Sequence, residues 1–542
     1  MNYPNFLHRG FAAALVLPLL VAACGDSPTG PSVAGPLAPT VVSGDMAALQ
    51  TTPAGHIRIG VIPSATTIRV GSDADFTVTD KATGATLFAG EGGDVTVDLL
   101  SLGGVDTRYW LQTSCSSESS RDDWLARAAA LGYETRTEFV PHVPCWRLLL
   151  GTEDQGWSAR VAFKEAAIED GLAGSDAFYK LITIVGETEL EATFEGEKVV
   201  VEAPVVLSSA DGLVRIGDRT YRGLAEVWTN SGGALAGINE LPLEEYLYGV
   251  VPRELPPVPY GLEEAQKAQA VTARTYALAN MGKRSSDGYD LLPTTGDQVY
   301  GGYQDEDEVS NAAVDATAGQ VAVHEGVLIS TLYHSTSGGW TANSEDVFVT
   351  ALPYLRGVPD AERGEALEYV PSVEVFMRNA NPINLRAHAE GDFESDWSVY
   401  HRWTVTWTKA EMAEILAGSF GASITEVTEV RVKERADQGR VLLIEFDTDA
   451  GTFEAGKDAI RWNLRYFDVN GNAASLRSTL FFIAPEVDRR TGETIGWKAY
   501  GGGWGHGVGM SQTGAVGMAE RGRTYEEILG HYYRGVEIEQ RD

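Results

Sequence analysis

The sequence predicts an α+β protein that consists mostly of antiparallel sheets with packed helices, plus one small α+β insert. Short alternations of apolar and polar residues, as in residues 56–61, 68–70 and 76–78, predict strands, and Gly and Asp turns separate them. An Ala-rich pattern with helical spacing over residues 262–281 predicts one long helix that packs on a sheet. At about 150 residues per domain, a chain of 542 residues corresponds to roughly two to four domains.

The composition limits what the chain can bind. Its formal net charge of −34 excludes nucleic acid as a partner, because contacts with phosphate require a basic surface. The hydrophobic fraction of 44% is ordinary for a globular protein and permits a large core. Acidity by itself indicates a self-repelling surface and identifies no substrate.

Residues 1–24 have the pattern of a secretory signal peptide. The start is weakly basic, and the apolar run of residues 11–23 is shorter than the roughly 20 apolar residues that span a bilayer. Residues 20–25 (Leu-Val-Ala-Ala-Cys-Gly) resemble the bacterial lipobox, in which the cysteine is lipidated. We therefore expect export and anchoring to the extracytoplasmic face of a bacterial membrane through lipid on Cys24. An ordinary signal peptide with a chance cysteine is the alternative.

Residues 25–55 are predicted to be a flexible linker, because Pro, Gly, Ser and Thr dominate and no hydrophobic period appears. About 30 residues of flexible coil span roughly 30 Å. Such a linker can hold the folded part away from the membrane. Strand patterns begin at His56 and define an N-terminal β region over residues 56–105, which continues over residues 173–212.

A compact insert is predicted between these two β regions, over residues 106–172. Its order is strand, helix, strand, strand, helix, with helices at residues 120–131, capped by Ser120, and 159–167. This order resembles the SPOR domain, a ferredoxin-like module that binds glycan strands stripped of their peptides. An unrelated small α+β module is the alternative. The resemblance rests on three short segments: residues 109–112, 131–133 and 146–151.

Cys115 and Cys145 are the only cysteines besides Cys24. In the oxidising compartment that an exported protein enters, this even pair predicts one disulfide. A metal site with two cysteines is the alternative, but no set of histidines surrounds them.

The most informative segments lie between residues 243 and 278. Residues 243–256 read Leu-Glu-Glu-Tyr-Leu-Tyr-Gly-Val-Val-Pro-Arg-Glu-Leu-Pro, and residues 266–278, within the predicted helix, read Gln-Lys-Ala-Gln-Ala-Val-Thr-Ala-Arg-Thr-Tyr-Ala-Leu. Prolines on both sides of Glu254 restrict the backbone and predict a rigid loop for its carboxylate. Both segments resemble the SpoIID/LytB family of peptidoglycan lytic transglycosylases.

Three further blocks continue this resemblance in the family's order, within a predicted SpoIID-like domain over residues 213–542. Residues 297–302 resemble the family turn that contains Gln-Val-Tyr. Residues 333–341 resemble its His-Ser-Thr-Ser-Gly-Gly block, and residues 503–515 resemble its C-terminal block that begins Gly-Trp-Gly-His-Gly.

The resemblance implies cleavage of the β-1,4 bond between N-acetylmuramic acid and N-acetylglucosamine, with Glu254 as the catalytic acid and base. A glycosidic oxygen leaves poorly unless it is protonated, so the carboxyl group needs a pKa raised by a poorly solvated site. Most glycosidases use two carboxylates. A lytic transglycosylase instead lets the sugar's own 6-hydroxyl attack the anomeric carbon, which gives a 1,6-anhydro product. The family blocks also imply these substrate-binding residues: Arg253, Gln269, Arg274, Tyr276, Gln298, Tyr300, His334, Ser335, Ser337, Trp504, His506, Ser511 and Gln512.

Other chemistries fit the motifs less well. His334 and Ser335 are adjacent in a predicted strand and would point to opposite faces, so they do not make a nucleophile–base pair. The glycine-rich residues 501–509 lack the Lys-Ser/Thr of a phosphate-binding loop. Some SpoIID-like proteins hold zinc through His and Cys, but this chain has no cysteine after Cys145. We therefore expect no metal and no cofactor; zinc held by His and carboxylate ligands is the alternative.

Two other functions are alternatives. The first is a non-catalytic protein that binds peptidoglycan and enhances or positions a cell-wall amidase. The second is a glycan-binding scaffold that acts through the SPOR-like insert. Peptidoglycan glycan strands are the expected partner in each case. Residues 360–405 show no family match, and Trp397, Trp403 and Trp407 fit either a core or a sugar-binding surface.

Overall fold

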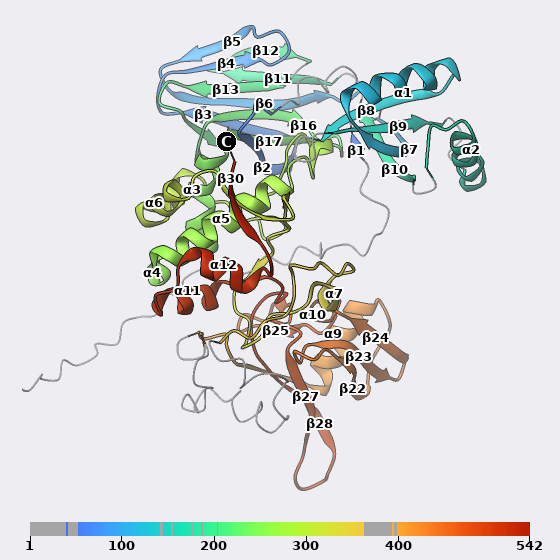
Figure 1. The fold of residues 1–542 in the computed structure, drawn as a ribbon, viewed down its shortest axis with the longest axis vertical. Helices are drawn as coiled ribbons and strands as arrows, with labels where there is room; N and C mark the ends of the chain where they lie inside the picture. The colour runs from blue at the N-terminus through green and yellow to red at the C-terminus, as the bar shows by residue number, and fades with distance from the viewer. Residues whose placement is uncertain are drawn as a thin grey trace, which may run out of the picture.

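The computed structural model describes residues 40–41, 52–103, 105–140, 145–152, 156–174, 177–185, 188–202, 204–361, 393–394 and 398–541. The predicted signal peptide, Cys24 and most of the predicted linker lie outside these ranges. Among the residues described, no helix is both long and apolar enough to cross a membrane. Figure 1 shows a β-rich part, a small α/β module beside it, a group of helices, and a further part with its own sheets.

Two six-stranded antiparallel sheets share one hydrophobic core in the β-rich part. On the strands, buried apolar residues alternate with more exposed ones, as with Ile68 and Val70 beside Thr67 and Arg69, so the predicted antiparallel strands are confirmed. The first sheet is β12 (Glu197–Val201), β11 (Glu189–Phe194), β6 (Gly93–Ser101), β3 (Thr67–Ser72), β14 (Leu213–Ile216) and β15 (Arg219–Arg222). The second is β2 (His56–Ala65), β17 (Leu235–Pro242), β16 (Leu224–Thr229), β13 (Val205–Ser209), β4 (Phe76–Asp80) and β5 (Thr86–Gly90).

A buried ion network ties three strands of the second sheet together. Arg58 on β2 lies 2.8 Å from Glu226 on β16 and 2.8 Å from Glu240 on β17. Lys81 lies 2.6 Å from Glu226. Burial alone would raise the pKa of Glu226, but the charges of Arg58 and Lys81 outweigh it and lower that pKa.

The predicted insert is a separate α/β module between β6 and β11, two strands that pair with each other. Its sheet order β10-β7-β9-β8 is that of the ferredoxin-like arrangement. The sheet includes β10, which lies beyond the predicted boundary at residue 172, and β1 (Thr40–Val41) pairs with β10 in parallel. The module comprises β7 (Val105–Ser116), α1 (Glu118–Ala130), β8 (Glu134–Val140), β9 (Cys145–Gly151), α2 (Trp157–Glu169) and β10 (Phe178–Val185).

Two details of the module concern predicted residues. The N-cap of α1 is Ser117 rather than Ser120, because the Ser117 side chain accepts the N–H of Ser120. Cys115 and Cys145 lie on the neighbouring strands β7 and β9. Their side chains lie outside the described part of the structure, so the disulfide stays a prediction.

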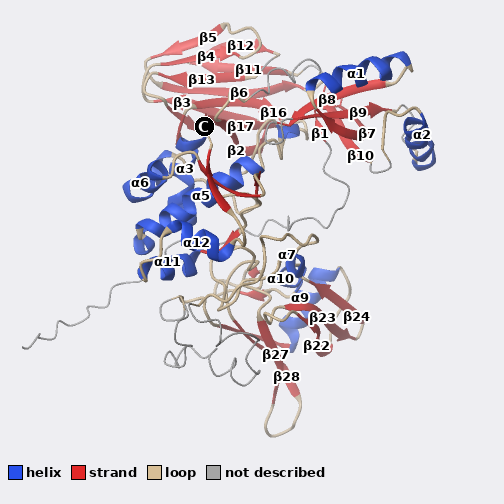
Figure 2. Ribbon diagram, viewed as in Figure 1, coloured by secondary structure: helices blue, strands red, loops and turns tan. Residues whose placement is uncertain are grey.

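Helix α5 (Glu263–Ala279) is the centre of the helical part. It packs against α3, α6, α11 and α12 (Figure 2). Ala270, Ala273 and Ala277 join the core of the β-rich part, whereas Ala268 and Val271 join a second core beneath α12. Small alanine side chains permit this close approach on several faces. The elements here are α3 (Leu243–Glu254), α4 (Pro257–Tyr260), η2 (Ser285–Asp287), η3 (Tyr303–Asp305), α6 (Glu308–Ala316), β18 (Gln320–His324), β19 (Val327–Leu328), α11 (Gln512–Glu520), α12 (Tyr525–Tyr532) and β30 (Glu537–Gln540).

The remaining part has its own hydrophobic core, which contains Trp403 and Trp407. These two tryptophans are therefore core residues, while Trp397 lies outside the described residues. The strands β27 and β28 form a long projecting hairpin (Figure 1). The elements are β20 (Tyr333–His334), α7 (Ser344–Val347), β21 (Trp403–Thr408), α9 (Lys409–Phe420), β22 (Val427–Arg435), β23 (Val441–Thr448), β24 (Gly451–Gly456), α10 (Ala459–Asn463), β25 (Tyr466–Phe467), β26 (Ala473–Ala474), β27 (Phe481–Val487), β28 (Thr494–Gly501) and β29 (Met510–Ser511).

The buried network predicts a large effect of Glu226→Gln on stability. Removing one charge leaves Arg58 buried with too few partners, so we expect the free energy of unfolding to fall by ~3–5 kcal/mol, measured by urea denaturation. Glu191→Gln is the matched control, because Glu191 pairs with the exposed Lys198 and should cost at most ~1 kcal/mol. Equal losses in the two variants would contradict the prediction.

Candidate active site

Glu254 is the last residue of helix α3. The prolines predicted a loop at this position, but Pro252 lies inside the helix, and the turn comes only at Leu255 and Pro256. A carboxylate in the last turn lies at the negative end of the helix dipole, which disfavours its ionised form.

The carboxylate of Glu254 is partly buried and accepts a hydrogen bond from the main chain. The N–H of Val299 donates to Oε1 at 2.6 Å, and the side chains of Tyr333 and Gln512 also favour the ionised carboxylate. Burial raises the pKa of Glu254 to about 7, against the smaller opposing effects of these donors and of Arg253. A carboxyl group with this pKa can serve as an acid and then as a base near neutral pH.

Segments far apart in the sequence meet at Glu254. The turn at residues 297–302 supplies Val299, and β20 supplies Tyr333. Gln512, the first residue of α11, donates from Nε2 to the main-chain carbonyl of Glu254 at 2.8 Å. The strands β20 and β29 pair in parallel, which brings residues 333–334 beside residues 510–511. The structure therefore brings four sequence blocks, residues 243–256, 297–302, 333–341 and 503–515, into one site.

The loop after β20 is held by the buried carboxylate of Glu394. Burial would raise the pKa of Glu394, but His401, whose Nδ1 lies 2.9 Å away, and hydroxyl and main-chain donors lower it to about 2. Glu394 has no exposed area, so its role is to join this loop to the start of α11. Its donors at 2.7–3.2 Å include Ser337 N, Gly338 N, Ser511 Oγ and Thr513 Oγ1.

His334 and His506 lie close together, with ring centroids 5.7 Å apart. His334 Nδ1 lies 3.2 Å from the Val508 carbonyl, so this nitrogen carries the proton. His506 Nδ1 accepts the Val508 N–H at 3.0 Å. Burial lowers the pKa of both, that of His506 to about 4, so both rings are neutral. In the described ranges, no group of three or more His, Cys, Asp and Glu residues is placed to hold a metal.

Most of the predicted substrate-binding residues are buried, which differs from the expectation that they contact glycan. Gln269 Oε1 accepts a hydrogen bond from Gln512 Nε2 at 3.3 Å. Tyr276 donates to Asp297 at 3.3 Å, close to the turn that holds Glu254. The buried residues are Gln269, Arg274, Tyr276, Gln298, Tyr300, His334, Ser337, Ser511 and Gln512.

Arg274 and Tyr300 are not brought to Glu254 as binding residues. Arg274 forms an ion pair with Glu244 at 2.6 Å and donates to two main-chain carbonyls. The hydroxyl of Tyr300 donates to Asn239 at 2.8 Å, and its ring belongs to the core of the β-rich part. Both residues stabilise the fold.

Four predicted residues keep exposed area: Arg253, Ser335, Trp504 and His506. The Trp504 ring lies edge-on against Tyr400, with centroids 4.2 Å apart, and both side chains are partly exposed. Such a pair can stack on a sugar ring. Arg253 lies beside Glu254 on the surface and is 3.5 Å from Asp305.

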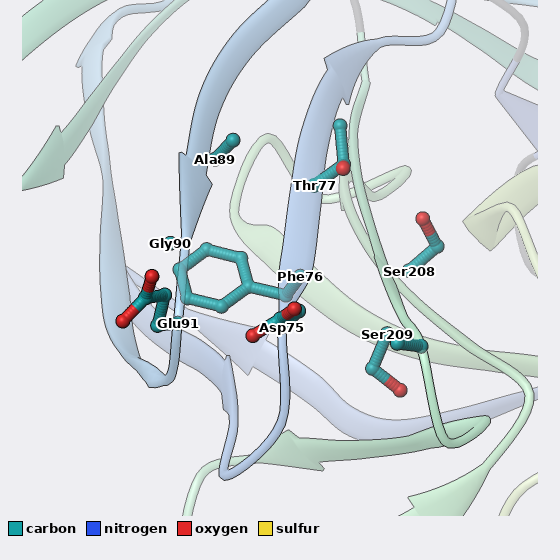
Figure 3. Close-up of a pocket in the computed structure, with 9 residues that line it drawn as sticks. Asp75, Phe76, Thr77, Ala89, Gly90, Glu91, Ser208 and Ser209 are labelled. Atoms are coloured by element: carbon teal, nitrogen blue, oxygen red, sulfur yellow. The ribbon is translucent and has the colours of Figure 1, made fainter.

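The hollow in Figure 3 lies on the β-rich part, between β4, β5 and β13. Its lining includes the exposed Asp75 and Glu91 and the ring of Phe76. None of the residues in the four sequence blocks lines it.

Comparison with known proteins gives two family matches. The family described as "Stage II sporulation protein" matches residues 231–324, and a "Domain of unknown function (DUF8618)" matches residues 342–509. The Stage II sporulation protein D of Bacillus amyloliquefaciens is 30% identical over 321 residues, which cover 56% of this chain and 76% of the relative. The chain belongs to the SpoIID family.

Two further relatives of this SpoIID-family chain differ in how much of their length it spans. An uncharacterised protein of Brachyspira hyodysenteriae is 30% identical over 335 residues, which cover 62% of this chain and 76% of the relative. The Amidase enhancer of Bacillus subtilis is 29% identical over 312 residues, which cover 54% of this chain but only 40% of that relative.

Three residues of the site were not among the predicted ones. Tyr333 directly precedes His334 in the same sequence block, and this position was the one signal by which the sequence could have identified it. Glu394 and Tyr400 fall in residues 360–405, which match none of the SpoIID sequence blocks, so there was no signal in the sequence for them. Only the fold places them beside the loop after β20 and beside Trp504.

The raised pKa predicts that Glu254→Gln changes stability in a pH-dependent way. The ordinary pKa is 4.5 and the folded one about 7, so between these values only the folded state holds the proton, and stability falls as pH rises. We expect the variant to be more stable than the wild type at pH 8, by at most ~3 kcal/mol, and equally stable at pH 5. Calorimetry at the two pH values checks this, and a difference that does not depend on pH would contradict it.

Glu394→Gln is expected to destabilise strongly the part of the protein that contains the loop after β20 and the start of α11. The amide cannot replace an ionised acceptor for several buried donors, so the expected loss is ~3–5 kcal/mol in urea denaturation. Glu454→Gln, on the exposed face of β24, is the control and should change stability by less than ~0.5 kcal/mol. A loss below ~1 kcal/mol for Glu394→Gln would refute the clamping role.

Proposed function

We propose that this protein is an exported, lipid-anchored lytic transglycosylase that cleaves the β-1,4 bond between N-acetylmuramic acid and N-acetylglucosamine in peptide-free peptidoglycan strands. The observation that carries the proposal is Glu254, a partly buried carboxyl group whose pKa is raised to about 7 at the meeting point of the four sequence blocks. Its SpoIID-family relatives are consistent with a role at the cell wall.

In the proposed reaction Glu254 acts twice. The protonated carboxyl group donates its proton to the glycosidic oxygen as the bond from the anomeric carbon to that oxygen breaks. The 6-hydroxyl oxygen of the same N-acetylmuramic acid then bonds to the anomeric carbon, and its proton passes to Glu254. The product carries a 1,6-anhydro ring, and the carboxyl group returns to its starting state.

The environment of the other carboxylates supports a reaction with one carboxyl group. Glu394 is fully buried and saturated with donors, so it cannot reach a sugar as a second carboxylate. The Asp297 carboxylate is engaged by Lys283 at 2.6 Å and Arg284 at 3.0 Å. A hydrolase with two carboxylates would need a free second group across the sugar.

In this proposal, the other parts of the chain keep the enzyme close to the cell wall and to its substrate. Lipid on Cys24 and the linker at residues 25–55 would keep the enzyme beside the wall. The ferredoxin-like module, with its resemblance to SPOR domains, would hold peptide-free glycan and thereby favour this substrate. The partly exposed Trp504–Tyr400 pair offers a surface on which a sugar ring could stack.

A second candidate function is a non-catalytic protein that binds peptidoglycan and enhances a cell-wall amidase. The observation that favours it is the relative in Bacillus subtilis whose name is Amidase enhancer. This function needs binding surfaces but no titrating glutamate. It therefore predicts that loss of the Glu254 carboxyl group leaves biological activity intact.

The deciding experiment incubates the purified protein with denuded glycan strands and identifies the products by mass. We expect 1,6-anhydro ends from the wild type and at least a ~1000-fold lower rate from Glu254→Gln, because the general acid is lost. Glu263→Gln is the control, since its side chain is 74% exposed on α5, and it should retain full activity.

Each other outcome of this experiment points to a different function. Reducing ends formed by water would show a hydrolase and sink the transglycosylase mechanism. No products from the wild type, together with retained glycan binding, would favour the amidase-enhancing function.

A further inference from the structure

We propose that Arg477 binds the free carboxylate of the lactyl group on N-acetylmuramic acid and thereby selects glycan strands from which the peptides have been removed. This inference rests on the proposed function, because it concerns the same glycan. The observation that carries it is a partly exposed guanidinium that lies over the rings of Tyr400 and Tyr466 and is paired with no acid among the described residues.

The main chain fixes Arg477 beside Trp504. The carbonyl of Arg477 accepts the N–H of Gly505 at 2.9 Å. Trp504 in turn exchanges two main-chain hydrogen bonds with Thr336, at 2.8 and 3.1 Å. The close approach requires glycine next to Trp504, because a Cβ on Gly503, whose φ is +81°, would lie 2.7 Å from the Thr336 carbonyl. Arg477 therefore has a defined place at the Trp504–Tyr400 pair.

The same loop is connected to the candidate acid. The carbonyl of Ser335 accepts the N–H of Thr513 at 3.0 Å. The residue before Thr513, Gln512, donates to the carbonyl of Glu254 at 2.8 Å. A hydrogen-bonded path therefore joins the Trp504 segment to the end of α3. Because a glycan strand is a long polymer, a strand that is cleaved at Glu254 has further sugars that can contact Arg477.

Arg477 differs from the neighbouring arginines in what its nitrogens contact. Arg402 donates to two main-chain carbonyls, and Arg440 is buried. Arg461 pairs with Asp458 at 3.3 Å. Within the described ranges, the guanidinium of Arg477 has only its two ring contacts. In a chain with 76 acidic and 42 basic residues, an exposed arginine without an acid beside it is available to an external anion.

Two tyrosine rings orient this guanidinium. Its central carbon lies 5.5 Å from the ring centroid of Tyr400 and 5.3 Å from that of Tyr466. At such distances the face of an aromatic ring attracts a cation. The planar group keeps its N–H donors at its edge, where they match the two oxygens of a carboxylate. Because the rings already restrict the side chain, less conformational entropy is lost when the anion binds.

The lactyl carboxylate is the anion that a peptide-free strand offers. In an intact strand this carboxyl group forms the amide bond to the peptide and carries no charge. After removal of the peptide it is a carboxylate, and it belongs to a sugar whose ring can stack on Trp504 and Tyr400. The net charge of −34 repels such an anionic strand, so its attraction has to come from a local cation such as Arg477.

The test is a thermodynamic cycle between the arginine of the protein and the carboxylate of the strand. The full chain with Glu254→Gln, which prevents turnover, is titrated in a calorimeter with denuded strands and with the same strands after conversion of their lactyl carboxylates to methylamides. We expect the methylamide strands to bind about 10- to 100-fold more weakly, as for the loss of hydrogen bonds to a charged group. Adding Arg477→Gln should weaken binding of the denuded strands alone and so abolish the preference.

Two further variants make the result specific. Arg477→Lys keeps the charge but loses the planar fork and its stacking, so it should retain only part of the preference. Arg490→Gln is the matched control, because it removes the same charge from an exposed position in the turn between β27 and β28. It should retain the full preference.

Two results would overturn the carboxylate site. One is an equal loss of affinity for both kinds of strand in Arg477→Gln, which would show a role in the fold or in stacking alone. The other is equal or tighter binding of the methylamide strands by the chain with Arg477 intact. This second result requires no change at Arg477, so it holds even where a variant fails to fold.

Activity of the wild-type chain on denuded strands separates this proposal from the function on which it rests. An Arg477-dependent preference in a protein that releases no 1,6-anhydro ends would defeat the transglycosylase function and support the carboxylate site. Release of 1,6-anhydro ends by a protein without the preference would overturn the site and leave the function standing.

Discussion

The short parallel pairing of β20 with β29 is the interaction on which the site depends. Two residue pairs, Tyr333 with Met510 and His334 with Ser511, join segments that are more than a hundred residues apart in the chain. Without this pairing, Tyr333 would not reach Glu254 and Gln512 would not hold the end of α3. The buried carboxylate of Glu394 stabilises this pairing, because it accepts hydrogen bonds both from the loop after β20 and from Ser511 at the start of α11.

Glu254 and Glu394 show how one residue type takes opposite roles within one site. Both are withdrawn from water, which by itself raises a carboxyl pKa. Glu394 meets enough donors, and His401, to lower its pKa to about 2, so it is a permanent anion that fixes structure. Glu254 meets few donors and lies at the negative end of a helix dipole, so burial prevails and its pKa is about 7. The number of hydrogen-bond donors, rather than burial alone, explains why Glu254 has a raised pKa and Glu394 a lowered one.

The buried polar residues around Glu254 form a support rather than a binding surface. Gln512 donates to Gln269 and to the main chain of Glu254, Gln298 donates to the hydroxyl of Tyr333, and the two neutral histidines both contact the main chain of Val508. Two buried nitrogens of this network, Gln269 Nε2 and His334 Nε2, have no hydrogen-bond partner in the described part of the structure, which costs stability. The groups near this network that keep exposed area are fewer, among them Tyr333, Ser335 and the Trp504–Tyr400 pair.

The sequence by itself determined the α+β class, the central helix α5, the βαββα order of the module and the identity of Glu254 as the candidate acid. Alternation, helix propensity and contiguous motifs report on neighbours in the chain, so they sufficed for these features. Only the tertiary structure decided that Arg274 and Tyr300 stabilise the fold, that Glu254 ends a helix, and that Glu394 and Tyr400 belong to the site. Burial and hydrogen-bond partners decided these roles, and both come from segments that meet only when the chain has folded.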